Sequence, residues 1–91
     1  MSKKQVEYIV HGFVQGVGFR YFVYEIANSL NLTGYAKNNY DGTVEIVAEG
    51  EEKDLATLFD NLKTGPSRAV VSKVERKISE FTGKFKRFDI F

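Results

Sequence analysis

The spacing of apolar residues changes along this chain from a period of two to a helical period, and it does so twice. Alternating apolar residues are typical of a half-buried strand, whereas apolar residues at i, i+3, i+4 and i+7 are typical of an amphipathic helix. Residues 5–11 alternate and predict a first strand, with one face made by Val6, Tyr8 and Val10. The segment from Phe19 to Leu30 follows the helical spacing and predicts a helix, which ends at Asn31 and Gly34.

The rest of the sequence repeats this order, with a hairpin in between. Asp41-Gly42 is a strong hairpin dipeptide, and Gly65-Pro66 cannot continue a helix. Gly50 is expected to end the strand that precedes the second helix. The predicted elements are a strand from Tyr35 to Asn38, a return strand at 43–49, a helix at about 51–63, a strand at 70–78, a turn at 80–83 and a short terminal strand at 85–91.

These elements occur in the order β-α-β-β-α-β, followed by the terminal strand. Two right-handed crossovers in this order give a ferredoxin-like α/β sandwich, an α+β fold with an antiparallel sheet and both helices on one face. Strands one and three are then central, and strands one and two run in the same direction. We therefore expect the loop at 12–18 and Asn38 to meet at one edge of the sheet, roughly 10 Å apart. Residues 1–91 are expected to form one domain.

The overall composition argues against several classes of protein. The chain has no cysteine, which removes disulfides, thiolate metal sites and thiol nucleophiles. Its net charge of +1 is smaller than the positive excess typical of nucleic-acid-binding domains. No apolar run approaches the roughly 20 residues that span a bilayer, and the N-terminus lacks a signal-peptide core. We expect a cytoplasmic monomer that binds neither nucleic acid nor membrane.

A glycine-rich loop joins the first strand to the first helix, and an arginine follows it. Residues 12–18 contain three glycines and lead into a helix N-terminus, whose unpaired N–H groups and positive dipole end favour anions. Arg20 stands in the first helical turn, where a cation is unfavourable by a few tenths to about 1 kcal/mol unless an anion binds there. The pattern indicates a phosphate site. A loop that only turns the chain, followed by a solvated arginine, is the alternative interpretation.

Asn38 is the second candidate for a site residue. By itself it is explained by turn chemistry, because asparagine is common just before a turn such as that at Asp41-Gly42. Its predicted place beside the loop favours a chemical role. A side-chain amide can accept a hydrogen bond from water and donate one to an oxyanion at the same time.

The remaining polar and aromatic candidates are assigned structural roles. His11, the single histidine, is expected to point into solvent at the end of its strand, and Asp41 is expected to serve the turn. Tyr21 and Tyr24 lie off the apolar stripe, where they flank either the pocket or the surface. Acidic residues are interpreted as a strand edge and an acidic first helical turn: Glu45, Glu49, Glu51 and Glu52. Residues 84–87 are expected to form a solvated edge that discourages strand pairing.

Two segments resemble the motifs of the acylphosphatase family. The first is Gly12-Phe13-Val14-Gln15-Gly16-Val17-Gly18-Phe19-Arg20, and the second is Gly34-Tyr35-Ala36-Lys37-Asn38 followed by Asp41-Gly42-Thr43-Val44-Glu45. The resemblance covers essentially the whole chain, including its length and the order of its elements. It implies the ferredoxin-like fold and the hydrolysis of acyl phosphates to a carboxylate and inorganic phosphate.

The functional residues of that family map onto individual positions of this sequence. The resemblance implies that Arg20 binds the phosphoryl group and that Asn38 positions the attacking water. It also implies that phosphate is held by the backbone amides of Gln15, Gly16, Val17, Gly18 and Phe19. No cofactor or metal ion is implied, and the small-molecule partners are an acyl phosphate and inorganic phosphate, as product or inhibitor. Val23 stands where a threonine is frequent, which puts in question a hydrogen bond that would support the site.

Three other interpretations share this fold. An RNA-recognition module has the same element order, but its aromatic motif belongs on strand three, and residues 43–49 contain no aromatic residue. A non-enzymatic phosphate-binding or interaction domain needs no pairing of Arg20 with Asn38. Acylphosphatase-like domains also stand at the start of large carbamoyl-transfer proteins. Residues 22–24 of this chain are similar to the helix of those domains, but those domains often carry proline at the position of Tyr21. We favour a free-standing hydrolase.

Overall fold

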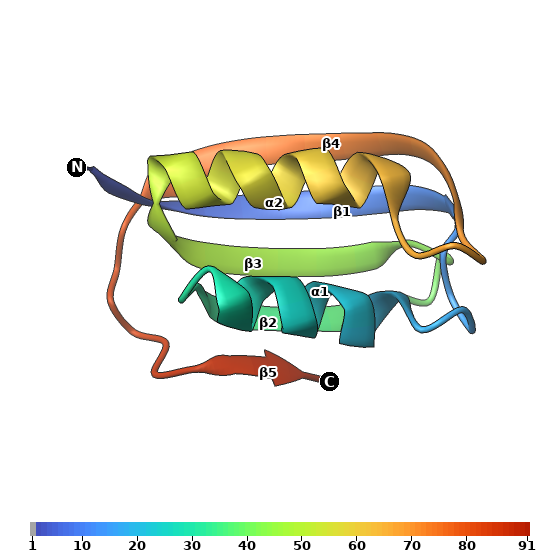
Figure 1. Ribbon diagram of the computed structural model, residues 1–91, viewed down its shortest axis with the longest axis horizontal. Coiled ribbons are helices and arrows are strands. Elements are labelled where there is room, and N and C mark those ends of the chain that lie inside the picture. Colours follow the sequence, from blue (N-terminus) through green and yellow to red (C-terminus); the bar gives the residue numbers. More distant parts are fainter. Residues whose placement is uncertain (1) are drawn as a thin grey trace.

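The computed structural model describes residues 2–91 and shows a five-stranded sheet with two helices over one face (Figure 1). The elements follow in the predicted order: β1 Lys3–Phe13, α1 Phe19–Ser29, β2 Thr33–Asn38, β3 Val44–Glu51, α2 Glu52–Thr64, β4 Val70–Glu80 and β5 Phe88–Ile90. The ferredoxin-like architecture is therefore confirmed.

The pairing of the strands places the ends of β1 and β2 together. The strand order is β4-β1-β3-β2-β5, and β3 pairs antiparallel with both β1 and β2. Val44 of β3 lies opposite Val10 of β1 on one side and opposite Asn38 of β2 on the other. Val10, three residues before the end of β1, is thus level with Asn38, two strand spacings or roughly 10 Å away, and the last residues of β1 lead into the loop at the same end of the sheet. This is the juxtaposition that the topology predicts.

The terminal strand makes the sheet mixed rather than antiparallel throughout. β5 lies at the edge of the sheet and pairs parallel with β2. It is shorter than the predicted strand at 85–91, and backbone hydrogen bonds extend the pairing at each end: Gly34 N–H donates to the Arg87 oxygen at 3.0 Å, and Phe91 N–H donates to the Ala36 oxygen at 2.9 Å. Because β5 runs parallel to β2, residues 90 and 91 lie toward the end of the sheet at which β2 terminates with Asn38.

Two predicted boundaries are wrong, and for one of them packing gives the reason. Gly50 does not end β3, which continues to Glu51. A Cβ atom at Gly50 would collide with the side chain of Leu32, so the glycine makes room for core packing rather than breaking the strand. Residues 80–83 do not form the predicted turn, because β4 continues to Glu80 and the chain then runs without helix or strand to β5.

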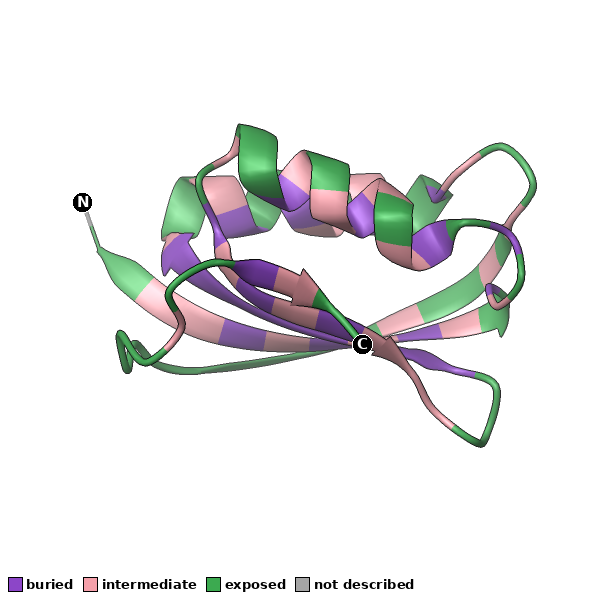
Figure 2. Ribbon diagram, turned by 90° about the horizontal axis from the view of Figure 1, so that it is seen from below, coloured by how far each residue is buried: buried purple, intermediate pink, exposed green. Residues whose placement is uncertain are grey.

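A cluster of buried apolar side chains fills the space between the helices and the sheet. Figure 2 marks the buried positions, which recur along the helices and the strands. From the strands it takes alternating residues such as Val6 and Tyr8, as the period of two predicts. From the helices it takes the stripes that include Val23 and Leu58. Tyr8 is fully buried, and its hydroxyl donates to the backbone oxygen of Leu55 at 2.8 Å, which ties β1 to α2. The core thus fixes both helices over the sheet and sets where α1 begins.

Candidate active site

A small cavity opens at the edge of the sheet where β1 and β2 end. It has a volume of about 180 Å³ and is lined by Val14, Gly16, Gly18, Phe19, Arg20, Tyr21, Asn38 and Ile90. The loop before α1, the first turn of α1, the end of β2 and the edge strand β5 all contribute to it. Sites for drug-sized ligands measure roughly 300 Å³ or more, so this cavity suits a smaller group. It brings Arg20 and Asn38 together.

The loop between β1 and α1 keeps a set of backbone donors unpaired. Gly16 and Gly18 have φ angles of 76° and 77°, in the left-handed region that glycine occupies without a Cβ clash. The first hydrogen bond of α1 runs from Phe22 N–H to the Gly18 oxygen at 3.0 Å. Within residues 2–91, no protein acceptor pairs with the backbone N–H groups of residues 15–21. Several donors therefore remain at the helix N-terminus, beside the positive end of its dipole.

The two helices differ in how their N-termini are compensated. α2 carries Glu52 and Asp54 in its first turn, which complement the helix dipole. α1 has no acidic residue in its first turn and no side-chain cap at Gly18, and it carries a cation at Arg20. The positive charge at the start of α1 is thus increased rather than neutralised, an arrangement that favours a bound anion.

Arg20 is partly buried, and its guanidinium forms a hydrogen bond with residue 91. Nη1 donates to the backbone oxygen of Phe91 at 2.6 Å. Among residues 2–91, no side-chain carboxylate forms an ion pair with Arg20. A guanidinium carries five N–H donors in a planar fork, so most of them remain available to an anion. Nothing in the sequence indicated the contact with Phe91, which joins residues 71 positions apart.

Asn38 ends β2 and forms part of the cavity wall. None of the side-chain hydrogen bonds within the described residues involves its amide, whereas its neighbour Asn39 donates from Nδ2 to Thr43 Oγ1 at 3.0 Å. The Gln15 side chain connects the loop to the same hairpin. Its Nε2 donates to the backbone oxygen of Asn39 at 2.7 Å and to the backbone oxygen of Thr43 at 3.0 Å. The sequence analysis considered only the backbone of Gln15. A long amide side chain within a glycine-rich loop was the available indication of this tether.

Asp41 serves the hairpin turn, as expected. Its Oδ1 accepts from the backbone N–H of Thr43 at 3.0 Å and from the Thr43 hydroxyl at 2.6 Å. These hydrogen bonds from Thr43 are the main cause of a lowered pKa at Asp41. These hydrogen bonds between Asp41 and Thr43 close the turn between β2 and β3. The closed turn keeps the end of β2 in place beside the loop.

Three other residues named from the sequence lie outside the cavity. His11 does not simply point into solvent, because its Nε2 lies 2.5 Å from Oε2 of Glu75 on β4. Tyr24 stacks on Tyr21 with ring centroids 6.0 Å apart, yet only Tyr21 lines the cavity. Val23 is fully buried in the core, so an apolar side chain fits there and no hydrogen bond reaches the site from this position. Residues 84–87 are mostly exposed, as expected, but they do not keep other strands away, because the Arg87 oxygen accepts a hydrogen bond from Gly34 of β2.

Glu49 corrects one interpretation of the acidic residues. It was expected at a strand edge, but β3 lies in the middle of the sheet and Glu49 is buried. Its carboxylate accepts hydrogen bonds from Gln5 Nε2, from the N–H and hydroxyl of Thr82, and from Gly83 N–H. Glu49 therefore fastens the segment after β4 to the sheet and takes no part in the cavity.

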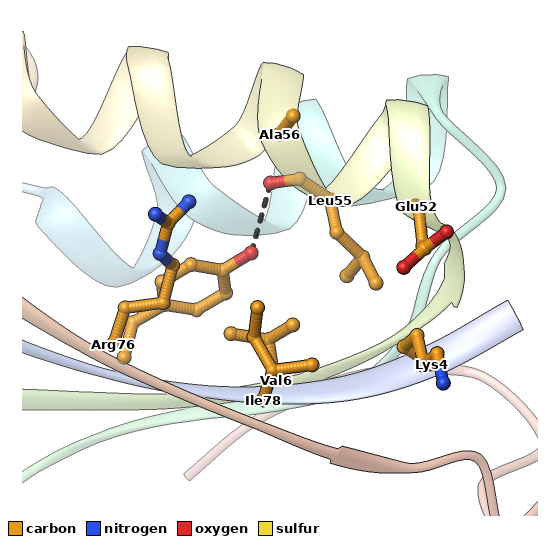
Figure 3. Close-up of a pocket in the computed structure, with 8 residues that line it drawn as sticks. Lys4, Val6, Glu52, Leu55, Ala56, Arg76 and Ile78 are labelled. Atoms are coloured by element: carbon orange, nitrogen blue, oxygen red, sulfur yellow. Dashed lines mark hydrogen bonds between the residues drawn. The ribbon is translucent and has the colours of Figure 1, made fainter.

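A second cavity, of about 210 Å³, lies between α2 and the strands β1 and β4 (Figure 3). Arg76 stands at one end of it and Lys4 with Glu52 at the other, with apolar side chains such as Val6 and Ile78 between them. Charges of both signs thus line this cavity. It contains neither the loop N–H groups nor Asn38, so a phosphoryl group is better matched by the cavity at the start of α1.

Two further features are absent from residues 2–91. No helix in this range is long and apolar enough to cross a membrane. The same residues contain no group of three or more histidine, aspartate or glutamate side chains placed to hold a metal ion.

Comparison with known proteins gives a consistent result. The sequence model of the acylphosphatase family matches residues 6–90. An acylphosphatase of Caldanaerobacter subterraneus subsp. tengcongensis is 49% identical over 98% of this chain and 99% of its own length. The crystal structure of acylphosphatase from Bacillus subtilis covers 97% of this chain and 98% of that one, with a TM-score of 0.93 and 41% identity. Full-length HypF, in a phosphate- and nucleotide-bound form, matches 99% of this chain with 12% of its own, at a TM-score of 0.90 and 35% identity.

Proposed function

The chain belongs to the acylphosphatase family, and from this premise we propose that its cavity hydrolyses acyl phosphates with Arg20 and Asn38 as the principal residues. One observation carries the proposal. A single small cavity combines an uncompensated helix N-terminus, an arginine without a side-chain carboxylate partner within residues 2–91, and the amide of Asn38. These groups are complementary to a phosphoryl group and a water molecule.

Arg20 and the loop bind the phosphoryl group. The guanidinium donates two parallel hydrogen bonds to two phosphoryl oxygens. The backbone N–H groups of residues 15–19 surround the remaining negative charge. Both sets of donors act on charge that is redistributed over the phosphoryl oxygens as the bond to the leaving group loosens. Because this positive charge comes from the protein, the proposed reaction needs no metal ion.

Asn38 positions the attacking water. Its side-chain oxygen accepts a hydrogen bond from the water and its nitrogen donates to a phosphoryl oxygen, which aligns the water opposite the leaving group. The water oxygen bonds to phosphorus while the bond from phosphorus to the acyl oxygen breaks, and the carboxylate leaves with the bonding electrons. A proton of the water passes to a phosphoryl oxygen, so the products are a carboxylate and inorganic phosphate. A carboxylate is a weak base and leaves without a protein acid.

Hydrolysis of benzoyl phosphate with a chelator present throughout tests the proposal. We expect turnover by the wild-type protein and almost none by Arg20→Ala, because the variant loses the bidentate grip on the phosphoryl group. We expect Asn38→Ala to turn over much more slowly, with the residual activity still inhibited by inorganic phosphate. Arg68→Ala removes an exposed arginine outside the cavity and is the matched control, with wild-type turnover expected.

Three results would contradict parts of this proposal. Near-normal turnover by Arg20→Ala would overturn the site assignment. Loss of wild-type turnover on chelation would contradict a metal-free reaction. An inactive wild-type protein that still binds phosphate would replace hydrolysis with a phosphate-binding role on the same fold.

A further inference from the structure

The cavity at the start of α1 has two chemically different parts. Its polar part is formed by Gly16, Gly18, Arg20 and Asn38, and its apolar part by Val14, Phe19, Tyr21 and Ile90. Val14 and Phe19 are 1% and 2% exposed, so they belong to the core and present almost no surface to a ligand. Tyr21 is 60% exposed and Ile90 is 38% exposed. Only these two apolar residues of the lining can contact a substrate extensively.

The direction of attack distinguishes Tyr21 from Ile90. In an in-line displacement the leaving group departs on the side of phosphorus opposite the attacking water. Asn38 holds the water from β2, which is part of the sheet, and both helices lie over one face of that sheet (Figure 1). Ile90 lies on β5, which pairs with β2, so it shares the layer of the water. Tyr21 lies in the first turn of α1, on the helix side, where the acyl group departs.

From this arrangement we propose that Tyr21 forms the contact surface for the acyl group and favours acyl phosphates with an aromatic or extended apolar acyl group. The inference rests on the proposed function, since it needs the phosphoryl group to be held by Arg20 and the water by Asn38. Tyr21 is suited to this role because its ring is already oriented by stacking on Tyr24, with centroids 6.0 Å apart and planes at 25°. An oriented ring loses little conformational freedom when a ligand packs against it.

A comparison of benzoyl phosphate with acetyl phosphate tests the inference, because the two substrates share the phosphoryl group and differ in apolar surface. Stacking between aromatic rings corresponds to a change in affinity of about fivefold. For Tyr21→Ala we expect the ratio of kcat/KM for benzoyl phosphate to that for acetyl phosphate to fall about fivefold. The loss should lie in KM rather than kcat, because the acyl group touches Tyr21 equally before and during the reaction. Tyr21→Phe keeps the ring and should keep the wild-type ratio.

Ile90→Ala and Tyr40→Ala are the comparison variants. Tyr40 is fully exposed at the hairpin and does not line the cavity, so its loss should change neither rate nor ratio. An unchanged ratio in Tyr21→Ala, or a fall that occurs in Ile90→Ala instead, would overturn the role of Tyr21 while leaving the hydrolase assignment standing. Failure of the wild-type protein to hydrolyse either substrate would instead contradict the proposed function itself. Inhibition by inorganic phosphate, measured in every variant, verifies that the phosphoryl subsite is intact.

Discussion

At the scale of single residues, Arg20 and Asn38 both depart from the local preference of the elements that carry them. A cation in the first turn of α1 opposes the helix dipole, and asparagine is disfavoured within a strand. In α2 the first turn follows the ordinary preference and is acidic. The departure at Arg20 is therefore confined to the helix that borders the cavity. An anion bound there would restore favourable electrostatics at the start of α1.

Asn38 gives a quantitative prediction at this scale. Asn38→Ala should lower kcat for benzoyl phosphate by about 10²–10³, the effect of losing one oriented polar group at a reacting centre. The inhibition constant for inorganic phosphate should change by no more than about threefold, because Arg20 and the loop are untouched. Asn28→Ala, at an exposed position of α1, serves as the control. A collapse of phosphate inhibition with kcat largely retained would assign Asn38 to phosphate binding instead.

At the scale of elements, two sets of side-chain hydrogen bonds connect separate segments, and each gives a prediction. In the first set, the Gln15 side chain connects the loop before α1 to the β2–β3 hairpin by donating to the backbone oxygens of Asn39 and Thr43. Gln15→Ala should lower kcat/KM about tenfold, since the loop amides and Asn38 lose their fixed relative position. It should also destabilise the fold by about 1 kcal/mol, measured by urea unfolding. Gln15→Glu should be worse, because a carboxylate not only fails to donate to these two backbone oxygens but also repels them through its negative charge. Lost stability with unchanged kcat/KM would show that the tether has no role in catalysis.

In the second set, the Glu49 carboxylate on β3 accepts hydrogen bonds from the segment between β4 and β5. Burial alone would raise the pKa of its carboxyl, but hydrogen bonds from Thr82, Gln5 and Gly83 favour the charged form and leave the pKa below the ordinary value of 4.5. Because the folded-state pKa is lowered, this carboxylate stabilises the fold fully above about pH 4.5. Its contribution is lost as the pH falls below that value and passes through the lowered pKa.

The effect of Glu49 is measurable as the free energy of unfolding against pH. At pH 7, Glu49→Gln should be less stable than the wild type by about 1–3 kcal/mol, the scale of disrupting hydrogen bonds to a buried charged group. The difference should shrink as both proteins are taken toward pH 3. Curves that remain parallel over this range would show that the charge of Glu49 does not contribute to stability.

One end of the sheet combines backbone N–H groups that lack a protein acceptor within residues 2–91 with the guanidinium of Arg20, although the net charge of the chain is only +1. Our proposal is that phosphate binds there. Binding of phosphate to the folded state alone should therefore raise thermal stability. At a concentration of ten times Kd the gain is about 1.4 kcal/mol, or roughly 5–10 °C in Tm for a domain of this size. Arg20→Ala should abolish this shift, and Arg76→Ala, in the other cavity, should retain it. Equal shifts in both variants would place the phosphate elsewhere.

Local patterns along the chain were sufficient to predict the elements and much of the lining of the cavity. Strand and helix follow from the spacing of residues such as Val6, Tyr8 and Phe19, because side-chain direction repeats with a fixed local period. The element order then restricted the topology to one in which the loop before α1 and Asn38 share an edge of the sheet, since crossovers are right-handed. Arg20, Asn38 and the loop were therefore named as neighbours without any coordinates.

The contacts between residues far apart in the sequence could be identified only from the packed fold. Four contacts join segments far apart in the sequence. They are the parallel pairing of β5 with β2, the hydrogen bond from Arg20 to the Phe91 oxygen, the hydrogen bonds from Gln15 to the hairpin, and the hydrogen bonds that buried Glu49 accepts from the segment after β4. Such contacts leave no local periodicity, because they depend on which elements the core packs side by side. The local pattern thus placed the groups along each element, and the packing of the elements selected their partners.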